Sequence, residues 1–303
     1  MKVLCSSEES LYRPEAVRWR ERMNLLRPLG NAVVILPCSM RKPYSNSKSH
    51  QIFMKVSRRI QEVILTSPFG ICPREMEKTY PIQSYDVSTT GDWSQEEIKV
   101  VGELLKDYVK EKEVLAHVSG GYMEVCKEYL DDCIFTCLDG RPTSPESMHN
   151  LKKHIKKYDK ISAREKLISG LKNLAIYQFG PEAESLITDD CHVKGRYHKR
   201  IFNSKGEQIA ALLMDNGLFS LNLEGGVRLV DTGVKWVNIG FELKTNTLFA
   251  PGVDSADPNI VPKDEVIILN KGNLVGVGKA ILSGEEMVKA SQGVAVRVRH
   301  RVK

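Results

Sequence analysis

The first 140 residues alternate between short apolar runs and amphipathic stretches. The apolar runs that predict strands are residues 32–36, 62–65, 114–118 and 133–138. The stretches in which charged and apolar residues interleave at helical spacing are 12–28, 52–60, 95–112 and 122–130. Strands that alternate with helices predict a mostly parallel sheet that is covered on both faces. We therefore expect an α/β domain of three layers over residues 1–146.

The pattern changes after the breaker Gly140-Arg141-Pro142-Thr143-Ser144-Pro145. Three helices are predicted first, at 147–158, 162–176 and 181–187, and then three strand-like segments, at 192–203, 208–214 and 218–223. Asn216-Gly217 is the expected hairpin turn between the last two of these segments. From residue 227 onward we expect almost only short strands. The sequence thus predicts a middle α+β domain over 147–230 and a small β-barrel over 231–303.

Composition is that of a soluble globular protein, with 42% apolar and 27% charged residues among 303. No apolar run approaches the ~20 residues of a membrane span, and the N-terminus lacks the apolar core of a signal peptide. The seven cysteines are odd in number and lie mostly in apolar runs, which favours reduced thiols. Cys126, Cys133 and Cys137 lack the paired spacing of a zinc site. We expect a cytoplasmic protein without a structural metal.

Charge is unevenly distributed along the chain. Residues 151–303 carry 24 Lys+Arg against 17 Asp+Glu, whereas the first 150 carry 20 against 21. A basic half joined to a neutral half predicts that the basic half contacts a polyanion, although a solvated basic face would give the same count.

The segment Pro37–His50 concentrates reactive side chains directly after an apolar run. It contains Cys38, Lys42 and His50 together with four serines and Tyr44. A buried strand that ends in such a loop is where α/β proteins place their chemistry. A cation near a thiol lowers its pKa, so Cys38 is a candidate nucleophile. The alternative is a polar turn with an incidental cysteine.

Two further loops are rich in polar groups. The loop at 66–81 holds Arg74, Glu75 and Tyr80, and the loop at 85–93 holds Asp86, Ser88 and Thr90. Loops that leave the carboxyl ends of parallel strands converge on one crevice. Cys38 would then have Asp86 or Glu75 as a proton donor. Asp86 could instead cap a turn, and Arg74 and Glu75 could form a surface pair. A Walker motif and a GxGxxG motif are both missing, so no nucleotide cofactor is expected.

These loops resemble archaeosine synthase, an archaeal tRNA-modifying family related to tRNA-guanine transglycosylase. The resemblance rests on PC-x3-KPY-x2-S-x2-H at 37–50, TSP-x-G-x2-PRE at 66–75 and YDVS-x-TGDWS at 85–94. The segments 249–253, 259–266 and 277–280 resemble a PUA domain, and residues 150–230 resemble the domain that precedes it in archaeal transglycosylases. A transglycosylase barrel takes about 200 residues. We therefore expect a short form that lacks this barrel and its base exchange.

The resemblance implies an enzyme that acts on 7-cyano-7-deazaguanine in the D arm of tRNA and converts the nitrile towards an amidine. The amine donor would be lysine, or glutamine, and a radical-SAM partner protein would act afterwards. We expect Cys38 to add to the nitrile as a thioimidate and Asp86 to supply the proton, with Lys42 and His50 assisting and no cofactor needed. The expected substrate-binding residues are Ser39, Tyr44, Ser47, Arg74, Glu75, Tyr80, Ser88 and Thr90.

The PUA resemblance implies contacts to the RNA backbone through two basic clusters. The expected RNA-binding residues are Lys194, Arg196, Lys199, Arg200, Arg297, Arg299 and Arg301. An edge strand protected by charge would explain the last three equally well. Two other functions stay open, namely a non-catalytic tRNA-binding subunit that positions a separate enzyme and an enzyme that acts on a free base or nucleoside.

Overall fold

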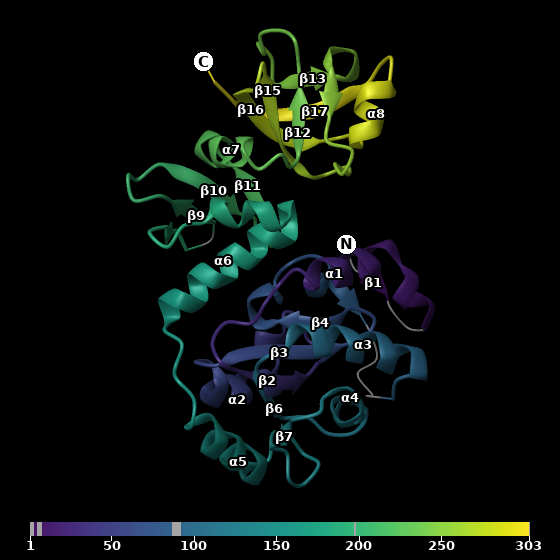
Figure 1. Ribbon diagram of the computed structural model, residues 1–303, viewed down its shortest axis with the longest axis vertical. Helices are drawn as coiled ribbons and strands as arrows, with labels where there is room; N and C mark the ends of the chain where they lie inside the picture. The colour runs from purple at the N-terminus through teal and green to yellow at the C-terminus, as the bar shows by residue number, and fades with distance from the viewer. Residues whose placement is uncertain (1–2, 5–7, 87–91, 197, 303) are drawn as a thin grey trace. The chain divides into compact units, whose positions relative to one another are not determined.

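The computed structural model describes residues 3–4, 8–86, 92–196 and 198–302 (Figure 1). The chain divides into two compact units, residues 1–173 and 174–303, which we describe separately. Within the described ranges, every helix is too short or too polar to cross a membrane.

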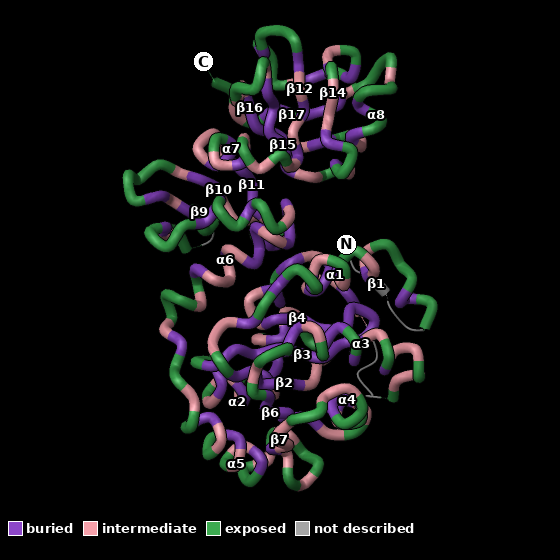
Figure 2. The backbone as a smooth tube through the Cα atoms, viewed as in Figure 1, coloured by how far each residue is buried: buried purple, intermediate pink, exposed green. Residues whose placement is uncertain are grey.

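Unit 1 is built on a five-stranded sheet with the order β4-β3-β2-β6-β7. Its strands are β2 (Ala32–Pro37), β3 (Gln61–Thr66), β4 (Gly70–Pro73), β6 (Glu113–Ala116) and β7 (Ile134–Phe135). Neighbouring strands run parallel except β4, which is antiparallel to β3. The side chains of Val33 through Leu36 are fully buried, as expected for a strand covered on both faces (Figure 2). A two-stranded parallel sheet of β1 (Val3–Leu4) and β5 (Tyr85–Asp86) lies outside this sheet.

Helices cover both faces of this sheet. They are α1 (Pro14–Met23), α2 (Lys48–Ser57), α3 (Gln95–Tyr108), α4 (Gly121–Tyr129) and α5 (Pro145–Ile155). Crossovers between parallel strands are right-handed, and β3 and β6 flank β2 on opposite sides. This handedness puts α2 on one face and α3 and α4 on the other. Accordingly α2 packs on α5, whereas α3 packs on α1 and α4. The predicted α/β fold is confirmed.

Helix starts follow from local sequence. Ser94 accepts a hydrogen bond from the Glu97 amide, and the Glu97 carboxylate accepts one from the Ser94 amide, so α3 begins with a complete capping box. Ser47 caps α2 by accepting from the His50 amide at 3.2 Å. The Ser47 cap fixes where the loop after β2 ends.

One glycine sets the spacing between α3 and α4. A Cβ atom on Gly102 would lie 2.2 Å from the Tyr129 ring, a distance that no side chain can occupy. The bare backbone at Gly102 therefore allows α4 to approach α3 closely.

Strand β4 falls in a segment, 66–81, that the sequence pattern marks as loop. It is only four residues long and ends in Pro73, so it carries little strand signal. Gly70, at φ +82°, adopts the left-handed conformation that reverses the chain between β3 and β4. Because β4 runs against β3, Arg74 and Glu75 emerge towards the end where β3 begins.

Unit 2 opens with the remainder of α6 (Ala163–Phe179), the 3-10 helix Pro181–Leu186 and an antiparallel sheet with the order β11-β10-β9-β8. Its strands are β8 (His192–Lys194), β9 (Lys199–Phe202), β10 (Gln208–Leu212) and β11 (Phe219–Leu221). The single strand predicted over 192–203 is wrong, because Gly195 at φ +103° begins a turn that folds this segment into a hairpin. The turn at Asn216-Gly217 is confirmed.

A second sheet, with the order β13-β17-β16-β15-β12-β14, surrounds its own core. Its strands are β12 (Trp236–Asn238), β13 (Thr247–Phe249), β14 (Ser255–Ala256), β15 (Glu265–Asn270), β16 (Asn273–Ala280) and β17 (Val294–Arg301). The predicted small β-domain is confirmed. Two helices, α7 (Leu223–Val230) and α8 (Gly284–Lys289), interrupt the region expected to be nearly all strands.

The division into units corrects the charge argument. Unit 1 carries 28 Lys+Arg against 23 Asp+Glu, whereas unit 2 carries 16 against 15. A split at residue 150 assigns the basic residues at the end of α5 and after it to the back half, although they belong to the unit that contains Cys38. Most of the net positive charge is therefore in unit 1.

Candidate active site

Cys38 lies at the topological switch point of the sheet, where the order in which the chain adds strands reverses. It follows β2, whose next helix covers one face, and the neighbouring strand β6 is followed by α4 on the opposite face. The loops after two such strands separate and leave a crevice at their carboxyl ends, which is where ligands bind in open α/β sheets. The sequence prediction that Cys38 lies at a strand end is confirmed.

Tyr122 is a direct polar partner of Cys38. Its hydroxyl lies 3.1 Å from the Cys38 sulfur, and the Tyr122 ring packs edge-on against Trp93, with ring centroids 4.8 Å apart. Sequence reasoning missed Tyr122, which lies in the first turn of α4. The available signal was the pair Gly120-Gly121 directly after a strand, because such a turn brings the first side chains of the next helix to the sheet edge.

Burial raises the pKa of the Cys38 thiol. The hydrogen bond with Tyr122, the Lys42 ammonium and a hydrogen bond with Thr66 act in the opposite direction but do not outweigh burial. The resting group is thus a protonated thiol, not the thiolate that the nearby cations suggest.

Lys42 closes the loop over a group of buried hydroxyls. Its ammonium donates to the Ser39 carbonyl at 2.7 Å and lies 4.2 Å from the centre of the Tyr85 ring. The Tyr85 hydroxyl in turn bonds to Tyr44 at 2.5 Å and to Thr66. Tyr44 and Tyr85 are both buried, and burial raises the pKa of both phenols, so they stay neutral.

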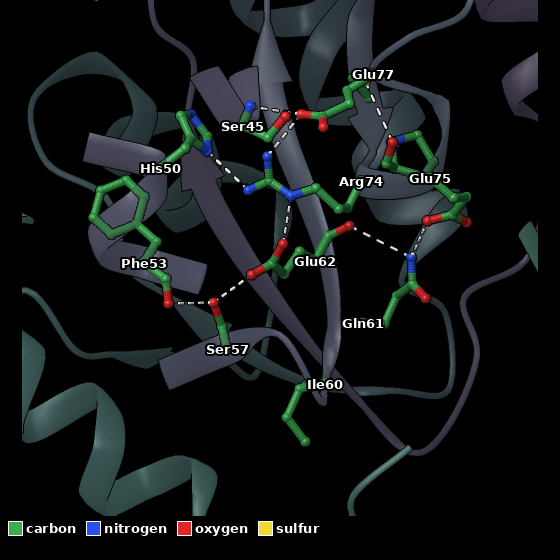
Figure 3. Close-up of polar contacts among 12 residues, drawn as sticks. Ser45, His50, Phe53, Ser57, Ile60, Gln61, Glu62, Arg74, Glu75 and Glu77 are labelled. Atoms are coloured by element: carbon green, nitrogen blue, oxygen red, sulfur yellow. Dashed lines mark hydrogen bonds and ion pairs between the residues drawn. The ribbon is translucent and has the colours of Figure 1, made fainter. Parts of the chain in front are cut away.

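Arg74 is the centre of a separate, densely paired cluster (Figure 3). Its guanidinium pairs with Glu62 at 2.5 Å and with Glu77 at 3.0 Å, and it donates to Nδ1 of His50 at 2.8 Å. The carboxylate of Glu77 also accepts from the Ser45 amide at 2.9 Å. Arg74 thereby ties the loop after β2 to the sheet.

His50 is fully buried within this cluster. Burial, followed by the positive charges of Arg74 and Lys42, lowers its pKa to about 3. The imidazole is therefore neutral at physiological pH, and its Nδ1 already accepts a hydrogen bond. The imidazole ring packs against the rings of Tyr44 and Phe53.

Glu75 points away from Arg74 and is held on both oxygens. It accepts from Gln61 at 2.9 Å and from Asn173 at 2.8 Å. A cavity of about 250 Å³ lies here, lined by residues that include Arg74, Glu75 and Lys166. Within the described part of the chain, no three His, Cys, Asp or Glu side chains gather as metal ligands.

The remaining predicted site residues have mixed positions. Asp86 follows Tyr85 on β5 and pairs through its backbone with Leu4, and its side chain is half-buried. Ser47 is the cap of α2, and Tyr80 is half-buried. Ser88 and Thr90 lie outside the described residues.

The basic residues of unit 2 differ in availability. Lys194, Lys199 and Arg200 are exposed on the β8–β9 hairpin, and Arg196 is exposed in its turn. On β17, Arg297 is exposed, but Arg299 forms a two-pronged pair with the buried Glu265 at 2.6 and 2.7 Å. Arg301 donates to the Lys244 carbonyl at 2.5 Å. The hydrogen bonds with Glu265 raise the pKa of Arg299, which fits a structural pair.

Three known domain families match successive parts of the chain. Residues 16–155 match a domain of unknown function (DUF5591), residues 169–233 match the patch-forming domain C2 of tRNA-guanine transglycosylase, and residues 234–302 match the PUA domain.

Whole-chain similarity extends to curated proteins and to a solved structure. The archaeosine synthase of Methanocaldococcus jannaschii is 36% identical over 95% of this chain and 52% of its own length. The archaeosine synthase subunit alpha of Thermococcus kodakarensis is 37% identical over 98% of this chain and 55% of its own length. The chain thus spans about half the length of the curated relatives it matches. The crystal structure of AF0587, a protein of unknown function, matches with a TM-score of 0.75 and 30% identity, covering 94% of this chain and 100% of that one.

Proposed function

We propose that this chain, which is similar over nearly its whole length to the archaeosine synthases of Methanocaldococcus jannaschii and Thermococcus kodakarensis, modifies tRNA and that Cys38 is its nucleophile. The substrate would be 7-cyano-7-deazaguanine in the D arm of tRNA, and the product an amidine on the way to archaeosine. The observation that carries the proposal is the Cys38 sulfur at the switch point of the sheet, 3.1 Å from the Tyr122 hydroxyl.

The chemistry balances without a cofactor. The thiol adds across the nitrile, so that a new S–C bond forms and the thiol proton ends on the nitrile nitrogen as a thioimidate. A primary amine then adds to the same carbon, the C–S bond breaks, and the sulfur leaves as a thiol with one proton from the amine. A neutral resting thiol suits this reaction, because the net addition consumes the thiol proton.

Tyr122 is the group best placed to move that proton. Its hydroxyl is within hydrogen-bond reach of the sulfur, so it can pass a proton between sulfur and nitrile nitrogen. Lys42 would lower the free energy of the thiolate that forms transiently during the addition. Asp86 would serve as proton donor or as base for the incoming amine. We assign His50 and Arg74 to holding the loop, since their hydrogen bonds and ion pairs are with each other and with Glu62 and Glu77.

Substrate recognition would come from the same loop and from unit 2. Ser39 and Tyr80, which are half-buried, would form the base pocket together with Tyr44 and Ser47. Lys194, Lys199, Arg200 and Arg297, which are exposed, would contact RNA phosphates. Arg299 would contribute less, because Glu265 already neutralises it.

Mass spectrometry of tRNA carrying the nitrile base tests the proposal. After incubation of the wild-type protein with lysine or glutamine, we expect an added mass on the tRNA. When the reaction without an amine is stopped by denaturing the protein, we expect a covalent protein–tRNA adduct. Cys38→Ser should give neither, while Cys72→Ser, which alters a buried thiol on β4, should give both. Turnover by Cys38→Ser at the wild-type rate would refute the mechanism.

A non-catalytic role is the second candidate, since the Thermococcus kodakarensis relative is named a subunit alpha. In that case a partner protein, such as a radical-SAM enzyme, would supply the chemistry. The same experiment separates the two functions: a tRNA-binding subunit would bind the tRNA but form no adduct through Cys38.

A further inference from the structure

The exposed ends of α2 and α5 carry a group of positive side chains that none of the roles above uses. The group, which we call the basic face, consists of Arg58, Arg59, Lys152, Lys153, Lys156, Lys157 and Lys160. All seven are exposed. None of them forms a side-chain ion pair or hydrogen bond within the described ranges.

The two parts of the basic face are adjacent in space. Helix α2 packs on α5, and the Ile161 amide donates to the Arg59 carbonyl at 2.9 Å. This backbone bond places Lys160 beside the end of α2. The burial of Leu151 and Ile155 fixes the inner side of α5, so the lysines between and after them face solvent.

Helix dipoles do not account for so much charge. Each helix C-terminus resembles about half a negative charge, so two of them offset about one cation. Seven cations with a single exposed acid in the same segments, Asp159, leave a large surplus. Consistent with this field, the positive charges of Lys157 and Lys153 add to burial in lowering the pKa of His154. Repulsion within the basic face thus lowers the stability of the isolated fold, and an anionic partner would offset this repulsion.

We infer that the basic face binds the phosphate backbone of RNA, so that the unit containing Cys38 has its own RNA contact; this rests on the proposed tRNA function. Helix α2 begins at the end of the Cys38 loop and its ten residues span about 15 Å. That length of duplex carries roughly nine phosphate charges. A nucleic-acid arm whose modified base enters the crevice can therefore lie along α2 and reach the basic face.

The concentration of net charge in unit 1 points the same way. Unit 1 has an excess of five positive charges and unit 2 an excess of one, although unit 2 contains the PUA domain. The long-range attraction for a polyanion is therefore strongest at the unit that we propose as catalytic. This arrangement steers the RNA towards the reactive thiol as well as towards the PUA domain.

The test is equilibrium binding of fluorescent tRNA to the full chain between 50 and 200 mM KCl. The variant replaces three lysines of the basic face, Lys153→Gln, Lys156→Gln and Lys157→Gln. The matched control, Lys99→Gln, Lys106→Gln and Lys110→Gln, removes the same charge from exposed positions on or just after α3, on the opposite face of the sheet.

We expect the basic-face variant to bind tRNA at least about tenfold more weakly, with the slope of log K against log salt reduced by about 2–3. The control should change binding less than about twofold. Equal losses in both variants, or no loss in the basic-face variant, would overturn the inference. So would loss of binding to phosphatidylserine vesicles with tRNA binding unchanged.

A second variant, Arg58→Gln with Lys160→Gln, should lower the slope by about 1–2 and guards against a folding defect in the first. Binding needs no turnover, so an inactive protein whose tRNA affinity depends on the basic face refutes the proposed function alone. Conversely, an active enzyme with unchanged affinity in both variants refutes only the role of the basic face.

Discussion

Cys38 and Arg74 lie on loops that look equally reactive in sequence, yet their surroundings in the fold are opposite. Arg74 has a partner on every side, with two carboxylates and a neutral imidazole within 3.0 Å. Cys38 has a phenol, a threonine hydroxyl and a cation near it but no carboxylate among its described partners. Paired charges hold the loop of Arg74 in place, whereas the Cys38 thiol is not engaged with a carboxylate among its described partners.

The largest effect should come from breaking the Arg74 cluster. Arg74→Met leaves Glu62 and Glu77 buried without their cation, and we expect a loss of about 3–5 kcal/mol in the free energy of unfolding. Urea denaturation measures it. The control Arg27→Met breaks an exposed pair with Asp107 at 3.5 Å and should cost less than about 1 kcal/mol. Similar losses in both variants would mean that the cluster is not structural.

His50 should make stability depend on pH in the same region. Its pKa in the folded chain is about 3, below the ordinary 6.5, so the unfolded chain binds a proton that the folded chain does not. Its contribution is complete above pH 6.5 and is lost as pH falls towards about 3, by a few kcal/mol in total. His50→Gln keeps an acceptor for Arg74 but cannot titrate. Unfolding curves of the variant and wild type that fall in parallel over this range would contradict the assignment.

Tyr122→Phe tests the surroundings of Cys38. Loss of the hydroxyl should slow adduct formation about a hundredfold, as expected for a lost proton relay, and should change stability by about 1 kcal/mol or less. Single-turnover kinetics with nitrile-bearing tRNA measures the rate. Tyr129→Phe, a phenol on the same helix, is the control. A Tyr122→Phe protein with the wild-type rate would remove Tyr122 from the mechanism.

Lys42→Met should have the smallest effect. Because the pKa of Cys38 is raised, the rate at which iodoacetamide alkylates it should still increase with pH above the range in which an ordinary thiol titrates. Mass spectrometry of the peptide that contains Cys38 measures this rate. Removing the Lys42 ammonium should move this profile to higher pH, because the thiolate loses a nearby positive charge. Lys48→Met, at an exposed position on α2, should leave it unchanged. A profile shifted to lower pH would show that Lys42 does not stabilise the thiolate.

The fold of unit 1 could be predicted because its strands are continuous apolar runs and its helices have clear caps, such as Ser94. The place of Cys38 followed from the same pattern. The pairing of His50 could not be predicted, since it depends on Arg74, which reaches it only because β4 reverses the chain. Tyr122 could not be predicted either, because its approach to Cys38 crosses 84 residues of chain. Local pattern determines elements, whereas contacts between loops depend on how the sheet is ordered.

The missing side chain at Gly102 has a consequence for how this protein can change. A methyl group there would clash with the Tyr129 ring, so that the ring or α4 must shift, and α4 carries Tyr122 at its other end. A shift of α4 caused by a mutation far from the thiol would then change the distance between the Cys38 sulfur and the Tyr122 hydroxyl. Variation at position 102 should accordingly change the rate of the adduct formation that we propose for Cys38, while leaving every proposed reacting group intact.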